Sequence, residues 1–288
     1  MNPATFIRKP RELGEVLGDS FCFLRANLKF IYKPILLIGV LWGITYSLGL
    51  YFGYINLSAN RFTTGTEFKV YLSSQTLITT VSGIASLSIF IILFNLINFK
   101  INHPDEEPTS SDLFNDFANK FFRLFLYSVI GGLLWMIFFI LLIIPGIWFS
   151  VIFIFLFPVT FFENETFGIV LTRTRFLIKN EWWNSFFCYL IPSLVIGIVL
   201  APLSGALGFY LVSHSSKGNF NSTIPNGLAI FYFFFILFSA FLNLWPSACL
   251  AFQYFSLVEK KDQNSLSRNI DSLGIGGPNQ ELSGPEEY

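Results

Sequence analysis

Long uninterrupted apolar runs are the feature of this chain that most restricts its fold. Six segments of 17 to 32 residues carry almost no charge, at 34–55, 76–99, 121–144, 146–162, 185–213 and 226–257. A helix needs roughly 20 apolar residues to cross the hydrocarbon core of a bilayer. Because the runs do not alternate with polar residues, they predict helices and not barrel strands. The sequence predicts an all-α integral membrane protein with six transmembrane helices.

The overall composition supports a lipid environment. Hydrophobic residues make up 53% of the chain and charged residues 12%, whereas charged residues are about 25% of an ordinary soluble domain. Membrane lipids are therefore the first expected partners. The formal net charge is zero, and we expect no nucleic-acid partner.

Most basic residues lie in alternate connections between the apolar runs. Fifteen of the eighteen Lys and Arg residues fall in the amino-terminal segment, the second and fourth connections and the tail. The first and fifth connections contain only Arg61, Lys69 and Lys217. Basic residues are retained on the cytoplasmic side of a membrane. The pattern predicts that both termini are cytoplasmic.

Three regions follow from these patterns. Residues 1–33 are charged and amphipathic and form a cytoplasmic segment, and residues 34–258 form the six-helix domain. Residues 259–288 are rich in Ser, Gly, Asn, Pro and acidic residues, a composition that buries too little apolar surface to fold alone. We predict a disordered cytoplasmic tail there.

The pair Pro145-Gly146 divides some forty apolar residues. Proline interrupts helical hydrogen bonding and glycine permits a turn, so the pair predicts a hairpin between the third and fourth spans. Trp148, just beyond, is a residue type suited to a membrane interface.

An amphipathic pattern with Gly and basic residues at matched places occurs twice, at 13–25 and 167–179, with a weaker copy at 112–122. It predicts three units, each an interfacial helix followed by a membrane hairpin, with interfacial helices near 110–122 and 165–179. Arg173, Arg175 and Lys179 lie off the apolar stripe and are candidate contacts to lipid headgroups. The alternative is that any amphipathic helix before a span would look like this.

The most specific stretch covers residues 121–191. It contains Ile144-Pro145-Gly146-Ile147, an apolar stretch to Pro158, Glu163, and then Leu171, Thr174, Leu177 and Lys179 before Trp182. This stretch resembles the six-helix bacterial membrane proteins related to the membrane domain of glycerophosphoryl diester phosphodiesterases. The resemblance implies a multi-pass protein of the bacterial inner membrane that stands alone, without established activity. The catalytic domain of those enzymes has no counterpart here, because the chain lacks a His-Arg-Gly motif and room for a barrel of about 250 residues.

No residue pattern predicts catalysis. The only two histidines, His103 and His214, fall on opposite membrane sides in the predicted topology, so they cannot form one site. The sequence has no nucleophile–base constellation, phosphate loop or zinc spacing. We therefore predict no enzyme activity, no cofactor and no metal.

Neutral polar residues inside the apolar runs form the remaining candidate site. A polar cavity in the cytoplasmic half is predicted from Asn95, Asn98, Asn243 and Gln253, with Glu163 at the boundary. The alternative is that these residues join helices by hydrogen bonds.

Two functions agree with these observations. The first is a non-enzymatic scaffold or accessory subunit of an envelope or membrane-homeostasis assembly, with a membrane-protein partner bound through the interfacial helices or the tail. The second is a transporter of a lipid-like or small neutral substrate. A continuous cavity lined by Asn95, Asn243 and Gln253 would favour transport, and a tightly packed interior would favour the scaffold. The sequence does not indicate an oligomeric state.

Overall fold

The computed structural model describes residues 6–58, 65–215 and 223–272. Every regular element in this part of the chain is a helix. The helices are α2 (Leu13–Ser58), α3 (Gly65–Asn102), α4 (Ser110–Leu113), α5 (Phe117–Leu141), α6 (Ile143–Glu163), α7 (Phe167–Ile178), α8 (Trp182–Ser215), α9 (Thr223–Leu242) and α10 (Leu244–Ser272). Six helical stretches in the described residues are long and apolar enough to cross a membrane. The predictions of an all-helical fold and of six helices able to span a membrane are confirmed at this level.

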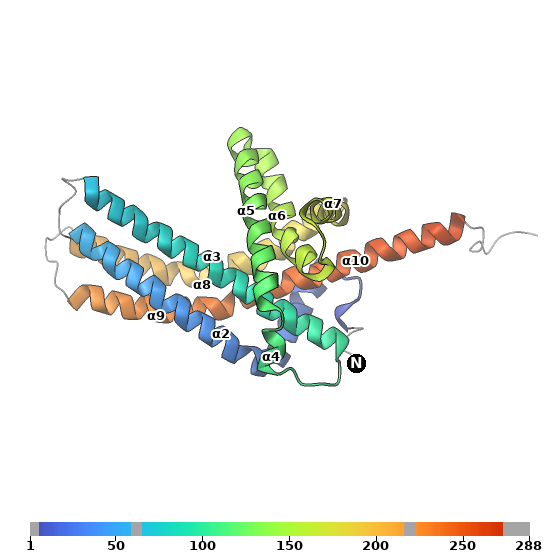
Figure 1. Cartoon of the computed structure of the whole chain (residues 1–288), viewed down its shortest axis with the longest axis horizontal. Coiled ribbons are helices and arrows are strands. Elements are labelled where there is room, and N and C mark those ends of the chain that lie inside the picture. The colour runs from blue at the N-terminus through green and yellow to red at the C-terminus, as the bar shows by residue number, and fades with distance from the viewer. Residues whose placement is uncertain (1–5, 59–64, 216–222, 273–288) are drawn as a thin grey trace, which may run out of the picture.

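The helices form a bundle and a separate arm. α2, α3, α8 and α9 run side by side in the bundle, where α2 contacts both α3 and α9 (Figure 1). α5 and α6 pack on each other and leave the bundle at a steep angle. α10 extends away on the side opposite the free end of the bundle. The two groups of helices meet in a junction that also contains α4 and α7.

The first half of α10 forms the centre of this junction. Residues 246–257 are buried without exception, and α10 contacts α2, α3, α6, α7 and α8. Aromatic rings fill the space around it: Phe252 lies against Phe6 and Phe23, and Phe162 lies against Phe255 at 4.8 Å between ring centroids. Burial of such rings is the main stabilising contribution available where lipid does not reach.

The part of the predicted amphipathic segment from Leu13 onward joins the first span without a break. α2 contains both, with Pro34 inside the helix. The apolar stripe of this segment, which includes Val16, Ser20 and Phe23, is buried, and it packs on α10, where the Ser20 hydroxyl lies 3.0 Å from the Cys249 thiol. The stripe is therefore covered by protein and not by the bilayer.

α9 and α10 are nearly one helix. They are separated at Asn243, whose N–H still donates to the Ser239 carbonyl at 3.0 Å. Pro246 follows three residues later and has no N–H to donate to the Leu242 carbonyl, so the helical hydrogen bonding of α9 does not continue into α10. The prediction of a disordered tail from residue 259 is corrected in part, since α10 continues to Ser272. Between Pro246 and Gly274 the sequence contains no Gly or Pro that would interrupt the helix, and residues 273–288 lie outside the described part.

The reversal between α5 and α6 occurs at Leu142 and not at the predicted Pro145-Gly146 turn. Leu142 is extended (φ −155°, ψ 129°), and its N–H donates to the Phe138 carbonyl at 3.1 Å. Pro145 lies in the first turn of α6, where proline is tolerated because no helical partner for its N–H exists. Gly146 has a packing role: a Cβ there would lie 2.8 Å from the Cα of Phe139.

The predicted interfacial helix near 110–122 is also corrected. α4 covers only Ser110–Leu113, and the left-handed Asp116 (φ 51°) separates it from α5, which begins at Phe117. A residue at this φ cannot lie inside a right-handed helix. The 165–179 segment does form a helix of its own, α7. The three sequence repeats thus have three different structures.

Candidate functional site

Asn95, the first residue of the predicted polar cavity, is buried in α3 and its amide is fully used. Its Nδ2 donates to the carbonyls of Leu113 (2.8 Å) and Asn115 (3.2 Å), and its Oδ1 accepts a hydrogen bond from Lys120 Nζ at 2.6 Å. The side chain therefore fixes the connection between α4 and α5 to α3. This geometry agrees with the alternative that intramembrane polar residues join helices.

The other amides of the predicted cavity lie apart from Asn95. Asn98 is exposed and accepts from Asn102 Nδ2 at 3.4 Å. Asn243 is also exposed, and its Nδ2 donates to the Ser239 carbonyl of the preceding helical turn at 2.7 Å. Gln253 is buried on α10, with 2% of its surface exposed. The structure does not bring these amides together in one site.

Glu163 forms a three-residue cluster at the junction. Its Oε1 accepts hydrogen bonds from Arg173 Nε at 3.0 Å and from the Tyr254 hydroxyl at 3.1 Å. The cluster joins the end of α6 to α7 and α10. Arg173, predicted to contact lipid headgroups, is thus engaged in an ion pair within the fold.

Arg175 and Lys179, the other two predicted headgroup contacts, are exposed. They line a hollow of about 340 Å³ together with Trp148 and Trp182, and Arg175 lies over the Trp148 ring at 6.0 Å. Two cations beside two indole rings are typical of a membrane interface. These two residues remain candidates for contact with an anionic headgroup.

A buried ion pair was not predicted from the sequence. The Arg11 side chain is fully buried, its Nε donates to Asp19 Oδ2 at 2.9 Å, and its other nitrogens donate to the carbonyls of Phe6, Ile7 and Lys9. Burial lowers the pKa of Arg11, an effect that the nearby Asp19 carboxylate opposes. The sequence offered one weak signal, an acidic residue eight positions after Arg11.

Residues with catalytic potential do not cluster in the described ranges. His103 Nδ1 lies 3.7 Å from Glu106 Oε1 in an exposed connection. Within residues 6–58, 65–215 and 223–272, no group of three His, Cys, Asp or Glu could hold a metal ion.

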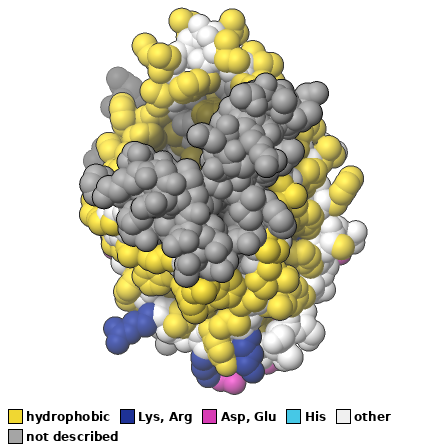
Figure 2. Space-filling view, turned by 90° about the vertical axis from the view of Figure 1, so that its left-hand side faces the viewer, with side chains coloured by type: hydrophobic (Ala, Val, Ile, Leu, Met, Phe, Trp, Pro, Cys, Tyr) yellow, Lys and Arg dark blue, Asp and Glu magenta, His cyan; other side chains and the backbone are white. Residues whose placement is uncertain are grey.

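Apolar side chains dominate the outside of the described structure. Viewed from the free end of the bundle, they cover the described surface, and charged side chains gather at the lower edge (Figure 2). At the tip of the arm, five successive large residues are 64–82% exposed: Ile140, Leu141, Leu142, Ile143 and Ile144. A surface of this kind requires lipid or a protein partner to cover it.

The arm also contacts the start of α8. Trp182 Nε1 donates to the Trp148 carbonyl at 3.2 Å. This contact places the charged α7–α8 connection, with Lys179 and Glu181, beside the first turns of α6. The first turns of α6 and α8 therefore lie next to each other.

No family model, curated protein or solved structure matches the chain. The family resemblance described from the sequence therefore stays a prediction.

Proposed function

We propose that this chain is a non-enzymatic protein of the bacterial inner membrane that serves as a scaffold or accessory subunit of an envelope or membrane-homeostasis assembly. The observation that carries the proposal is that polar side chains at the junction are used to hold the fold. Asn95 fixes the α4–α5 connection and Glu163 joins α6, α7 and α10. Groups engaged in this way stabilise helix packing and do not present a binding site.

A transporter of a lipid-like or small neutral substrate is the second candidate. It would need a polar path through the interior. The hollows of about 430, 360 and 340 Å³ in the described part of the chain have none of Asn95, Asn243 and Gln253 in their linings. The scattered amides therefore support the scaffold over the transporter.

The proposed membrane arrangement distinguishes the bundle from the arm. The bundle helices cross the bilayer with both termini cytoplasmic, and α7 lies at the cytoplasmic interface with Arg175 and Lys179 toward headgroups. The α5–α6 hairpin enters from the same side and ends in the hydrocarbon. Residues 129–149 carry no charge, so a tip that emerged into water would expose only apolar side chains.

The α7–α8 connection supports this depth for the arm. Trp148, which contacts Trp182, is five residues after the start of α6, a distance of roughly 8 Å at 1.5 Å per residue. If the charged connection lies at the interface, the stretch of α6 between Trp148 and the tip of the arm is too short to cross a core of about 30 Å. The length of α6 alone would permit a crossing, but its contact with Trp182 opposes one.

Partner binding is assigned to surfaces outside the polar cluster. α7 has two exposed apolar residues, Ile169 and Phe176, and the tail after α10 provides a second candidate segment. An assembly subunit needs exposed surfaces of this kind to bind its partner, whereas a transporter needs a substrate path through its interior.

Replacing Asn95, Asn243 and Gln253 together by Leu is expected to leave partner association intact. Each change removes polar atoms from the predicted cavity, so a transporter would lose substrate movement while the folded protein persisted. We expect a lower free energy of unfolding, by about 1–3 kcal/mol, mainly because the carbonyls and ammonium bonded to Asn95 lose their partner. Quantitative mass spectrometry of proteins that co-purify from native membranes measures association, and lipid or solute flux in vesicles measures transport.

Two further variants locate the partner surface. Ile169→Asp with Phe176→Asp alters the exposed apolar side of α7, and deletion of residues 262–288 removes the end of α10 together with the tail. Thr172→Asp is the matched control, because Thr172 is exposed on the same helix. The scaffold proposal would be contradicted if the triple Leu variant lost association while the α7 double variant and the tail deletion both retained it.

A further inference from the structure

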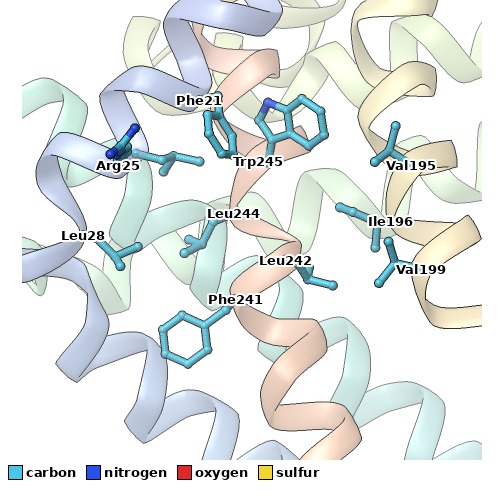
Figure 3. Close-up of a pocket in the computed structure, with 11 residues that line it drawn as sticks. Phe21, Arg25, Leu28, Val195, Ile196, Val199, Phe241, Leu242, Leu244 and Trp245 are labelled. Carbon is cyan, nitrogen blue, oxygen red and sulfur yellow. The ribbon is translucent and has the colours of Figure 1, made fainter. Parts of the chain in front are cut away.

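A hollow of about 430 Å³ opens on the side of the bundle, between α2, α8 and the break that separates α9 from α10 (Figure 3). Its volume lies in the range of small-molecule sites, roughly 300–1,000 Å³. Leu24, Ile196 and Leu244 form a buried floor. Phe21 and Val199 at the rim are about half exposed, so the hollow is open toward the surrounding lipid.

The lining is apolar and firmly held. Phe21 and Trp245 lie edge to face at one end, with ring centroids 5.8 Å apart. The Trp245 Nε1 donates to the Leu17 carbonyl at 3.4 Å, so the indole N–H already has an acceptor. A ligand in the hollow would therefore meet hydrocarbon almost everywhere.

Arg25 is the single charged residue in the lining. It lies on α2 beside Leu28 at the edge of the hollow, and it is exposed. Lys29, one turn later, has an acidic partner in Glu107 at 2.6 Å. No side chain in the described part of the molecule forms an ion pair or hydrogen bond with Arg25.

We propose that this hollow binds one anionic phospholipid from the cytoplasmic leaflet, with an acyl chain in the hollow and the phosphate at Arg25. The chemistry of the lining selects this ligand. The walls require hydrocarbon, and the one cation requires one anionic group at the mouth. Arginine forms paired hydrogen bonds with phosphate oxygens, and Trp245 suits the level of the headgroups. Free phosphate would find no second donor here, and a neutral lipid would leave Arg25 without its anion.

Lipid titration of the full-length protein tests the site. Purified, delipidated protein is titrated with fluorescent phosphatidylglycerol and with the phosphatidylcholine analogue in detergent. Arg25→Gln should weaken phosphatidylglycerol binding about fivefold, because one cation near a membrane surface contributes about that factor, and leave phosphatidylcholine binding unchanged. Val199→Trp should reduce binding of both lipids, since the indole fills the hollow. Inorganic phosphate should not compete.

Lys33→Gln is the matched control. Lys33 is an exposed cation on the same helix and is absent from the lining of the hollow. An equal loss of phosphatidylglycerol binding in Lys33→Gln and Arg25→Gln would show general surface attraction and overturn the proposal. Unchanged binding in Arg25→Gln, competition by inorganic phosphate, or retention of a fatty acid in place of phospholipid after purification would also overturn it. Arg25 is exposed, so its variant should fold even if Val199→Trp does not.

Discussion

Asp19→Asn is expected to lower the free energy of unfolding by about 3 kcal/mol, because it leaves the buried charge of Arg11 without its carboxylate. Arg11 is enclosed between the rings of Phe6 and Phe252, at 5.5 and 4.9 Å from their centroids. The Arg11 side chain itself has no exposed surface, so the guanidinium is poorly placed to gain hydration in exchange for the carboxylate. Arg11 keeps its hydrogen bonds to backbone carbonyls, so we expect a loss of stability near the lower end of the range for breaking a buried ion pair, about 3–5 kcal/mol. Unfolding in mixed detergent by denaturant titration measures the effect.

Asp105→Asn is the control for charge alone, since Asp105 is exposed and should change stability by less than about 0.5 kcal/mol. Adding Arg11→Met to Asp19→Asn removes the unpaired charge and should restore at least about 1 kcal/mol. If Asp19→Asn and Asp105→Asn unfold alike, the buried ion pair does not stabilise the junction.

Gly146→Ala is expected to destabilise the α5–α6 hairpin by about 2 kcal/mol. The new Cβ would lie 2.8 Å from the Cα of Phe139, and a backbone atom can move away only if the two helices separate. Overpacking of this kind typically costs about 1–3 kcal/mol. Thermal unfolding of the purified protein, together with proteolysis at the arm, measures the change.

Gly132→Ala is the matched control on the same hairpin. The nearest atom to its new Cβ is Phe153 Cζ at 4.0 Å, so no group has to move. The alanine should be neutral or stabilise the helix by up to about 1 kcal/mol. Equal destabilisation by the two substitutions would show that the close approach at Gly146 is not what holds the helices together.

The class of the fold was predictable because solvent preference is a property of each segment alone. An apolar run of 20 residues needs lipid or a large core wherever it lies, and the six runs reappear as helices. Helix boundaries were less predictable. Proline before glycine indicates a turn, yet Pro145 is accommodated in the first turn of α6 and the reversal falls at Leu142.

The side-chain contacts of the junction could not be predicted, since they join distant parts of the chain. Arg11 is one of the basic residues of the amino-terminal segment that were used to predict orientation, but it is enclosed by Phe252, which follows 241 residues later. Asn95 was recognised as a polar residue in an apolar run. Its acceptors are the carbonyls of Leu113 and Asn115, in a connection that turns at the left-handed Asp116.

Spin-label accessibility at the tip of the arm tests the central claim, that this is a membrane-embedded protein whose α5–α6 hairpin ends in hydrocarbon. Ile144→Cys and Asp105→Cys are each made with Cys22→Ser, because Cys22 is exposed while Cys188 and Cys249 are buried. In reconstituted vesicles, the label at Ile144 should collide with dissolved oxygen and not with a water-soluble nickel chelate, and the label at Asp105 should show the reverse. A label at Ile144 that the nickel chelate reaches, from either side of the membrane, would contradict the account.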